Sequence, residues 1–240
     1  VVIPDYVRTI DHGAFHGCRE LESVILPPTL VSLTGEAFRN CAQLARLSFA
    51  KSSDNFMIRD GVLYSAQGDV IVFCPPVVRT LPCLLPTVTR IGNGAFCGCA
   101  IERAVLPDGI TEINDCTFYR CTGLSNVIIP NSVESIGSYV FYCSLLTEID
   151  IPDNVKSIGK GAFAECYKLD DVSLPDGIPE ISDYLFYNCS SLKTIAIPGS
   201  VRSIGEYAFT TCHLLSEIYF IGDEDEWNSI DITERGNIIL

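Results

Sequence analysis

Residues 157–166 read SIGKGAFAEC, and residues 203–212 read SIGEYAFTTC. The two stretches share Ser, Ile, Gly, Ala, Phe and Cys at the same positions. The Phe of this motif recurs along the chain at Phe15, Phe38, Phe96, Phe118, Phe141, Phe163, Phe186 and Phe209. Successive copies are 22 or 23 residues apart, with one interval of 58. A fixed period of this length predicts a stack of similar coils, because each repeat must cover its apolar side with its neighbour.

The clearest unit, residues 146–168, reads LTEIDIPDNVKSIGKGAFAECYK. Its L-x-x-I-x-I segment has the alternation of a strand, and the Pro that follows ends that strand. The Val and Ile of V-x-x-I are expected to face inward where the chain returns across the coil. A-F-x-x-C predicts a short turn of 3₁₀ or α-helix. One strand in about 23 residues is typical of a leucine-rich repeat. We therefore predict an α/β repeat fold: a right-handed leucine-rich-repeat solenoid of roughly ten coils, with a parallel β-sheet on one face and short helical or 3₁₀ turns on the other.

The 58-residue interval contains DNFMIRDGVLYSAQGDVIVFCPP, residues 54–76. Two apolar runs, 62–64 and 70–73, lie on either side of a turn that contains Gly68, which predicts an inserted β-hairpin. The domain organisation we expect is a single leucine-rich-repeat domain over 1–240, with the hairpin insertion at about 54–76 and a terminal cap at about 215–240.

The repeat resembles the BspA-like leucine-rich repeats, also called the Treponema pallidum-type repeats. The residues that carry the resemblance are I-P-x-x-V-x-x-I-G-x-x-A-F-x-x-C, complete in 151–166 and 197–212. DGVLYSAQGDVIVFCPP is similar to the hairpin insertion of that family, and YFIGDEDEWNSI to its terminal unit, with Trp227 filling the end. Some units depart from the pattern, for example at Thr117, Val140 and Leu185. The resemblance implies a secreted or surface-displayed bacterial or protist protein that binds host proteins, without shared catalytic residues.

Composition excludes several partners. The chain has 16 Lys and Arg against 30 Asp and Glu, a formal charge of −14. This charge argues against a nucleic acid, which requires a basic face, and against docking on an anionic membrane. No apolar run is long enough for a membrane-spanning helix, so we expect no membrane insertion. The opening VVIPDY lacks the features of a signal peptide and reads as the interior of a repeat, so it says little about the full-length protein.

Twelve cysteines would ordinarily suggest a disulfide framework or a metal site. Their positions within the repeat indicate a different role. Seven occupy the repeat position: Cys18, Cys41, Cys99, Cys121, Cys166, Cys189 and Cys212. Cys143 is one place early, and we expect it to serve its coil in the same way. We predict a buried ladder of reduced thiols, because parallel stacking points neighbouring Cβ vectors alongside one another.

Three alternatives concern the remaining cysteines, which are Cys74, Cys83, Cys97 and Cys116. Cys97 and Cys116 with Cys99 and Cys121 could suggest zinc, but C-x-C is not the usual C-x₂-C spacing. A Cys74–Cys83 bridge across the exit of the insertion is the second alternative, and two unpaired thiols the third.

Nothing in the sequence predicts catalysis. His12 and His16 lie in the first unit and His213 in the last, so they cannot share a site. No nucleophile elbow, zinc-protease or phosphate-loop motif is present. The acidic run 223–226 lacks the spacing of a calcium loop and is typical of a solvated surface. We expect no enzyme activity, no cofactor and no metal.

The sheet face is the expected binding surface, because repeat stacks bind along it. The outward positions of four neighbouring strands give the candidate site: Arg103, Val105, Asn126, Ile128, Glu148, Asp150, Asp171 and Ser173. Val105 and Ile128 form an apolar pair beside acidic residues, a combination found at protein interfaces. The alternative is that β-branched residues simply suit strands.

The turns predict a second stripe, which consists of Tyr119, Tyr139, Tyr142, Tyr184, Tyr187 and Tyr207. Tyr is favoured at interfaces, but stacking between adjacent coils explains the spacing of most of these residues.

These observations together predict a monomeric, non-catalytic binding or adhesion module that is secreted or on the cell surface. The expected partner is a host extracellular protein or glycoprotein. Two alternatives remain: a structural spacer without a ligand of its own, and an intracellular protein-interaction scaffold.

Overall fold

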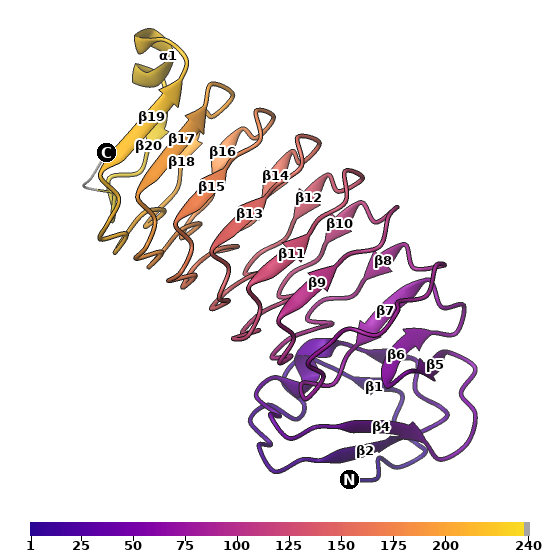
Figure 1. Cartoon of the computed structure of the whole chain (residues 1–240). Helices are drawn as coiled ribbons and strands as arrows, with labels where there is room; N and C mark the ends of the chain where they lie inside the picture. Colours follow the sequence, from indigo (N-terminus) through magenta and orange to yellow (C-terminus); the bar gives the residue numbers. More distant parts are fainter. Residues whose placement is uncertain (238–240) are drawn as a thin grey trace.

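The protein is a solenoid of stacked coils, as the repeat predicts (Figure 1). The computed structural model describes residues 1–237. A typical coil has a longer strand on one face, here called a face strand, and a two-residue strand on the opposite side, here called a return strand. The face strands are β2 (Ser23–Leu26), β4 (Arg46–Phe49), β9 (Arg103–Val105), β11 (Asn126–Ile128), β13 (Glu148–Asp150), β15 (Asp171–Ser173), β17 (Thr194–Pro198) and β19 (Glu217–Ile221).

The return strands follow the Ser-Ile-Gly part of the motif. They are β1 (Thr9–Ile10), β3 (Ser32–Leu33), β8 (Arg90–Ile91), β10 (Glu112–Ile113), β12 (Ser135–Ile136), β14 (Ser157–Ile158), β16 (Glu180–Ile181), β18 (Ser203–Ile204) and β20 (Asp231–Ile232). Where face strands or return strands pair with one another, they pair in parallel, because every coil runs in the same direction.

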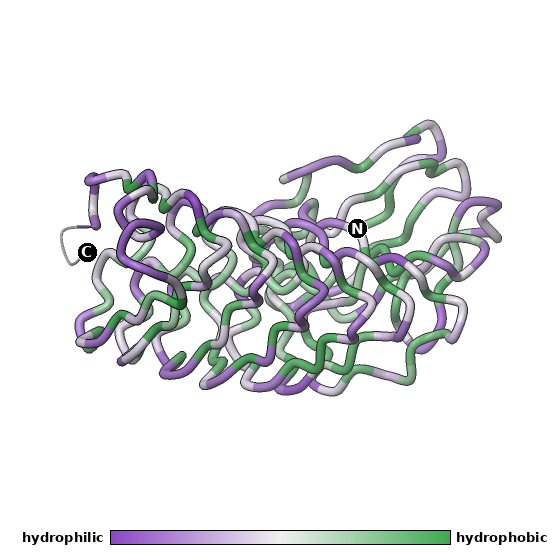
Figure 2. Tube along the Cα trace, turned by 90° about the horizontal axis from the view of Figure 1, so that it is seen from above, coloured by the Kyte–Doolittle hydropathy of each residue, from purple (hydrophilic) through white to green (hydrophobic). Residues whose placement is uncertain are grey.

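The core is a column of motif phenylalanines. From Phe96 to Phe209 the successive rings lie 5.1, 5.7, 5.6, 5.6 and 5.8 Å apart between centroids and are nearly parallel. All of these rings are buried. Around them, the central residue of each three-residue face strand points inward, as Ile149 does in β13. Figure 2 shows the same alternation of apolar and hydrophilic residues along the coils. The stacked coils bury what a single coil would expose.

The A-F-x-x-C segment is mostly a set of hydrogen-bonded turns, and only Gly35–Phe38 forms a 3₁₀ helix among residues 1–237. The reason is backbone conformation. In the other coils a residue with positive φ lies two places before the motif Phe, and another lies two places after it, as Tyr184 and Asn188 do around Phe186. Left-handed residues interrupt a helix. In the second coil Glu36 lacks this conformation, and the segment tightens into the 3₁₀ turn.

The predicted hairpin is present and is extended by a third strand. β6 (Val62–Ser65) and β7 (Val70–Phe73) pair in an antiparallel manner across the turn that contains Gly68. β5 (Phe56–Arg59) pairs with the outer edge of β6, across a turn at Asp60–Gly61. Sequence analysis did not identify β5, although the apolar run Phe56-Met57-Ile58 followed by Asp60-Gly61 was an available signal for a further strand and turn.

The insertion also replaces part of a coil. β7 pairs in parallel with the return strand β8, so it takes the place of a return strand. The amide of Cys74 donates to the carbonyl of Ala95 at 2.7 Å, as the amide of Phe96 donates to Thr117. With β7 counted beside the nine return strands of residues 1–237, the total agrees with the predicted number of coils.

The hairpin separates two apolar clusters. Val62, Tyr64 and Ile71 pack into the large cluster that runs to the C-terminal end. Leu63 and Phe73 pack into the smaller cluster of the first two coils, where the ring of Phe73 lies 5.0 Å from that of Phe38. β2 and β4 run in a different direction from β9 to β19 (Figure 1). The insertion is thus buried on both faces, which explains its continuous apolar runs.

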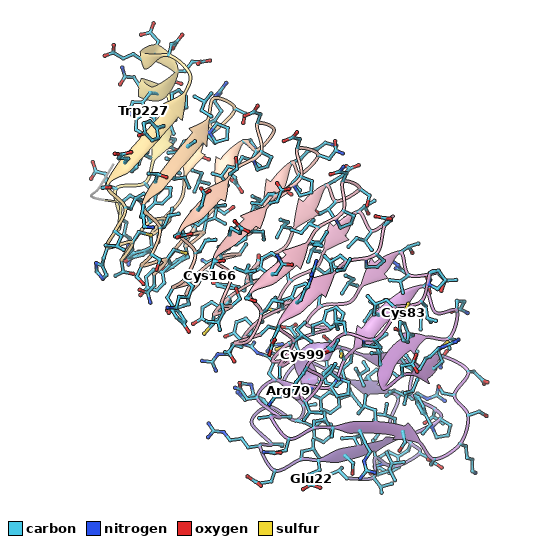
Figure 3. All side chains as sticks on the ribbon, in the orientation of Figure 1. Glu22, Arg79, Cys83, Cys99, Cys166 and Trp227 are labelled. Carbon is cyan, nitrogen blue, oxygen red and sulfur yellow. The ribbon has the colours of Figure 1, made fainter. Side chains whose placement is uncertain are left out.

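The C-terminal end carries a short helix, α1 (Glu224–Asn228). Asp223 begins it with a capping box: its side chain accepts from the amide of Glu226, and the side chain of Glu226 accepts from the amide of Asp223. Trp227, at the end of the stack in Figure 3, lies 5.4 Å from the ring of Phe220. The acidic run therefore has a structural role at the helix start. The last part of the predicted cap, 238–240, lies outside the described residues.

Candidate functional site

The eight residues predicted for the sheet face lie on four neighbouring strands, and all are exposed. Arg103 is the register partner of Asn126, and Val105 of Ile128, across β9 and β11. Across β13 and β15, Glu148 is the partner of Asp171, and Asp150 of Ser173. Val105 and Ile128 are 54% and 44% exposed. Large aliphatic side chains are more often buried. The structure therefore brings the predicted residues together on one surface.

The sheet is interrupted within this surface. No ladder pairing joins β11 to β13 among the described residues, although the two strands are neighbours. The intervening coil is one residue shorter than its neighbours between the motif Phe and the next Leu: five places separate Phe141 from Leu146, and six separate Phe163 from Leu169. A hollow of about 410 Å³ lies at the interruption. It is lined by 126–129, 148–150 and 171–173.

A second hollow, of about 550 Å³, adjoins the first and shares Ile128 with it. Val105 and Arg103 form its floor, and residues 80–84 form its wall. Sequence analysis did not assign this wall to the site. The apolar run Leu81-Pro82-Cys83-Leu84 was the available signal, because no predicted strand accounts for it; in the structure Leu81 and Leu84 are partly buried against the core and Cys83 is exposed. Together the two hollows are here called the face groove.

The groove carries unbalanced charge. Among residues 1–237, Glu148, Asp150 and Asp171 form no ion pair. The nearby Lys193 ammonium lies 3.4 Å from Asp170. Glu148 and Asp171 lie directly opposite one another, an arrangement of like charges that disfavours the sheet.

The tyrosine stripe is a set of stacked pairs, as the spacing indicated. Tyr119 stacks on Tyr142 with centroids 4.8 Å apart, and Tyr184 stacks on Tyr207 at 4.9 Å. The two tyrosines without an obvious partner in the sequence contact a tyrosine of their own coil: Tyr139 meets the edge of Tyr142, and Tyr187 is tilted against Tyr184. The stripe therefore stabilises neighbouring turns.

The cysteine ladder is present in six coils, and its thiols have a shared role. Cys166 Sγ donates to the carbonyl of Phe141, one coil earlier, at 3.1 Å. Equivalent bonds at 2.9–3.1 Å link four other ladder thiols to the preceding motif Phe, namely those of Cys41, Cys121, Cys189 and Cys212. Cys99 donates instead to the carbonyl of Cys74, which replaces a motif Phe in the insertion. Cys99 and Cys166 lie along the turn side of the stack (Figure 3).

Two predictions about the ladder are wrong. Cys18 is exposed, because no coil in the structure covers its side of the first unit. Cys143 does not serve as the ladder residue of its coil. It is only partly buried and has a positive φ of 61°, whereas Ser144, three places after Phe141, is buried at the ladder position. The missing residue of this coil therefore follows the ladder position.

The buried thiols are held in their neutral form. Burial raises the pKa of Cys166 and of Cys212 to about 12. Burial also raises the pKa of Cys97 and of Cys116 to about 12, with the nearby Glu36 carboxylate contributing in the same direction. A thiol must lose its proton to act as a nucleophile or metal ligand, so these cysteines are packing residues.

The alternatives for the other cysteines find no geometric support. All twelve cysteines are free thiols in the structure, with Cys74 buried and Cys83 exposed. No group of three or more His, Cys, Asp or Glu side chains within 1–237 is arranged to hold a metal ion. The histidines are separated as expected: the first two contact Glu36 and Asn40, and His213 lies near the opposite end. In the described part of the chain, no helix is long and apolar enough to cross a membrane.

Comparisons with known proteins agree with this architecture. The profile of the BspA type leucine rich repeat region matches residues 1–66 and 89–216 in six copies. A leucine rich cell surface protein of Faecalibacterium prausnitzii is similar, with 26% identity and a TM-score of 0.71 over 96% of this chain and 62% of that one. The chain thus spans less than two thirds of that relative. No curated protein matches the sequence.

Two further structures share the fold. The pneumococcal vaccine antigen PcpA has 20% identity and a TM-score of 0.71 over 97% of this chain and 66% of that one. A leucine-rich repeat protein of Eubacterium ventriosum has 16% identity and a TM-score of 0.60 over 91% and 54%. The repeat, its inserted hairpin and the matched profile lead to one assignment: the chain belongs to the BspA-type leucine-rich repeat family.

Proposed function

We propose that the chain is a non-catalytic binding module, displayed on the cell surface or secreted, that holds an extracellular protein or glycoprotein of a host on its sheet face. The observation that carries this proposal is the face groove. Two adjoining hollows lie on the exposed residues of four neighbouring strands, with an apolar pair next to unpaired carboxylates. Apolar surface rimmed by charge favours association with another protein.

The similar cell surface protein of F. prausnitzii supports the proposed location. The module is proposed to act as a monomer, since the groove needs no second copy to complete it.

The test is binding of the purified protein to immobilised extracellular matrix proteins and glycoproteins, compared between the parent and two double variants. Ile128→Lys with Asp150→Lys changes the groove. The matched control, Val31→Lys with Glu112→Lys, makes the same change in net charge at exposed positions on the return path.

Binding by the parent and the control, but not by the groove variant, is the expected result. Equal binding by all three proteins would place the site elsewhere. If none binds while all remain folded by circular dichroism, a structural spacer becomes the better account.

A further inference from the structure

The face groove has two chemically different ends. Near β9 and β11 its lining is mainly apolar, with Val105, Ile128, Leu81 and Leu84, and it also includes one residue of each charge, Arg103 and Asp108. At β13 and β15 it is acidic and holds Glu148, Asp150 and Asp171. A partner that fills both ends must therefore combine an apolar group with positive charge.

The acidic end is suited to cationic side chains. Its three carboxylates are exposed and have no ion-pair partner within 1–237, and two of them are register partners. Lys or Arg from a partner would relieve the repulsion between Glu148 and Asp171 and add charge-assisted hydrogen bonds. A metal ion is a poorer fit, since no cluster of the described side chains has the geometry of a metal site.

Arg103 places a positive charge at the mainly apolar end of the groove. It lies on β9, at the apolar end, and forms no ion pair among the described residues. Because Arg103 and Asp108 both line this end, it adds no net attraction for a uniformly basic partner, and sulfated or sialylated glycans would be repelled at the acidic end. The charge pattern thus favours a polypeptide in which an apolar residue precedes or follows a basic one.

The distance between the two ends limits the length of that segment. Hydrogen-bonded neighbouring strands are about 4.8 Å apart, and the unpaired step from β11 to β13 is not narrower, so the three steps from β9 to β15 span at least roughly 14 Å. An extended chain rises about 3.3 Å per residue and covers that distance in four or five residues.

We infer that the face groove binds an extended polypeptide segment in which an apolar residue and one or two Lys or Arg residues lie about three to five positions apart. The apolar residue occupies the hollow at Val105 and Ile128, and the basic residues meet Glu148, Asp150 and Asp171. This inference rests on the proposed function and names the chemistry of the partner.

The test is selection of a random peptide library displayed on phage, with the Ile128→Lys/Asp150→Lys variant used to remove peptides that bind elsewhere. The affinity of the selected peptides is then measured by fluorescence polarisation against three proteins. These are the parent, the groove variant Glu148→Gln/Asp150→Asn/Asp171→Asn, and the control variant Glu20→Gln/Glu112→Gln/Asp231→Asn. The control removes the same three charges from exposed positions outside the groove, so it separates a local effect from the general attraction of basic peptides to an acidic protein.

The expected result is enrichment of peptides with the apolar and basic pattern. Their affinity should fall by about tenfold or more in the groove variant, fall further with added salt, and change little in the control. Neutral or acidic peptides, or an equal loss in both variants, would overturn the inference. Such peptides would still have been selected for failure to bind the Ile128→Lys/Asp150→Lys variant, so the sheet face would remain a binding surface and the proposed function would stand.

A glycan array with the same proteins covers the competing class of partner. A neutral glycan that binds the parent and not the groove variant would overturn the inference and leave the proposed function in place. Absence of any binder, peptide or glycan, that depends on the groove would contradict both.

Discussion

Ser144 and Cys166 occupy the same position in successive coils, and their Oγ and Sγ atoms lie 3.3 Å apart in the buried core. Cys166 also donates to the carbonyl of Phe141. A small side chain with a hydrogen-bond donor is what the two coils have in common here. The bond to the preceding motif Phe carbonyl is made by the Cys166 thiol, whereas the described contact of the Ser144 hydroxyl is with Cys166, so a small buried side chain at this position need not contain sulfur.

Cys166→Ala tests this relationship. The substitution leaves a small cavity and removes the donor to the Phe141 carbonyl, so we expect unfolding in urea to show a loss of about 1–3 kcal/mol. Cys166→Ser keeps a donor and should lose less. Cys18→Ala, at an exposed site, should change the stability by less than about 0.5 kcal/mol. Equal effects of Cys166→Ala and Cys18→Ala would contradict a structural role for the ladder.

The native thiols should differ sharply in reactivity. At neutral pH a chromogenic disulfide reagent should modify Cys18 and Cys83 rapidly, since both are exposed, and Cys143 more slowly, since it is partly buried. The buried thiols should react only when the protein opens, because they are inaccessible and protonated. Mass spectrometry of the labelled peptides identifies each site. Rapid labelling of Cys121 or Cys189 in the native protein would show that the core is open.

Alkaline pH should destabilise the protein. The pKa of Cys166 and of Cys212 is raised to about 12 in the folded state, against about 8.5 for an unfolded cysteine. Above the unfolded pKa the unfolded chain releases protons that the folded thiols retain. The stabilisation is complete below about pH 8.5 and is lost as pH rises toward about 12.

Each such thiol should lower the free energy of unfolding by about 1.4 kcal/mol per pH unit in that range. Urea unfolding near pH 7.5, 9 and 10 measures the slope. Cys166→Ser should reduce this slope by the contribution of one thiol. An unchanged slope would show that Cys166 does not contribute to the pH dependence.

At Gly35 the backbone of the second coil lies close to the backbone of Gly94, in the part of the chain after the hairpin. A Cβ at this position would collide with the carbonyl of Gly94, which is backbone and cannot move aside. Gly35→Ala should therefore cost about 1–3 kcal/mol, measured by urea unfolding. Gly177 is the control, because a Cβ there would lie 3.7 Å from its nearest neighbour, the Val155 carbonyl oxygen. If the two alanine variants were equally stable, the packing at Gly35 would be looser than the structure shows.

Neutralising the acidic end of the groove should stabilise the free protein. Asp171→Asn removes the like charge opposite Glu148, so we expect a gain of about 0.2–1 kcal/mol at low salt. The gain should shrink as salt rises, since the charges are exposed. Glu112→Gln, on the return path, provides the comparison. A loss of stability in Asp171→Asn would indicate that the carboxylate has a structural partner.

The repeat made most of this architecture predictable, because a phased pattern assigns each residue to an inward or outward place. Val105 and Ile128 could be assigned to one surface without a structure for that reason. The short coil is the exception. Cys143 has the residue type of the ladder, but Ser144 lies three places after Phe141, where the ladder residue lies in the other coils. The direction of a side chain depends on its distance from the motif Phe along the chain and not on its residue type.

The groove was only partly predictable. Outward positions follow from strand alternation, whereas the wall at 80–84 depends on the path of an irregular segment between the hairpin and β8. No periodicity determines such a path. The interruption between β11 and β13 coincides with a coil that is one residue shorter than its neighbours, and the sequence shows the shorter count without showing which strands fail to pair.

The length of the stack and the orientation of its coils depend on different parts of the sequence. Adding coils extends the stack along its axis and keeps every outward residue on the same side. Burying a hairpin with one apolar face toward each cluster changes the orientation of the coils that precede it. A chain built from coils and inserted hairpins becomes longer with each added coil and changes direction at each hairpin. The position of a hairpin among the coils would then determine where a long repeat protein bends and which way each of its surfaces points.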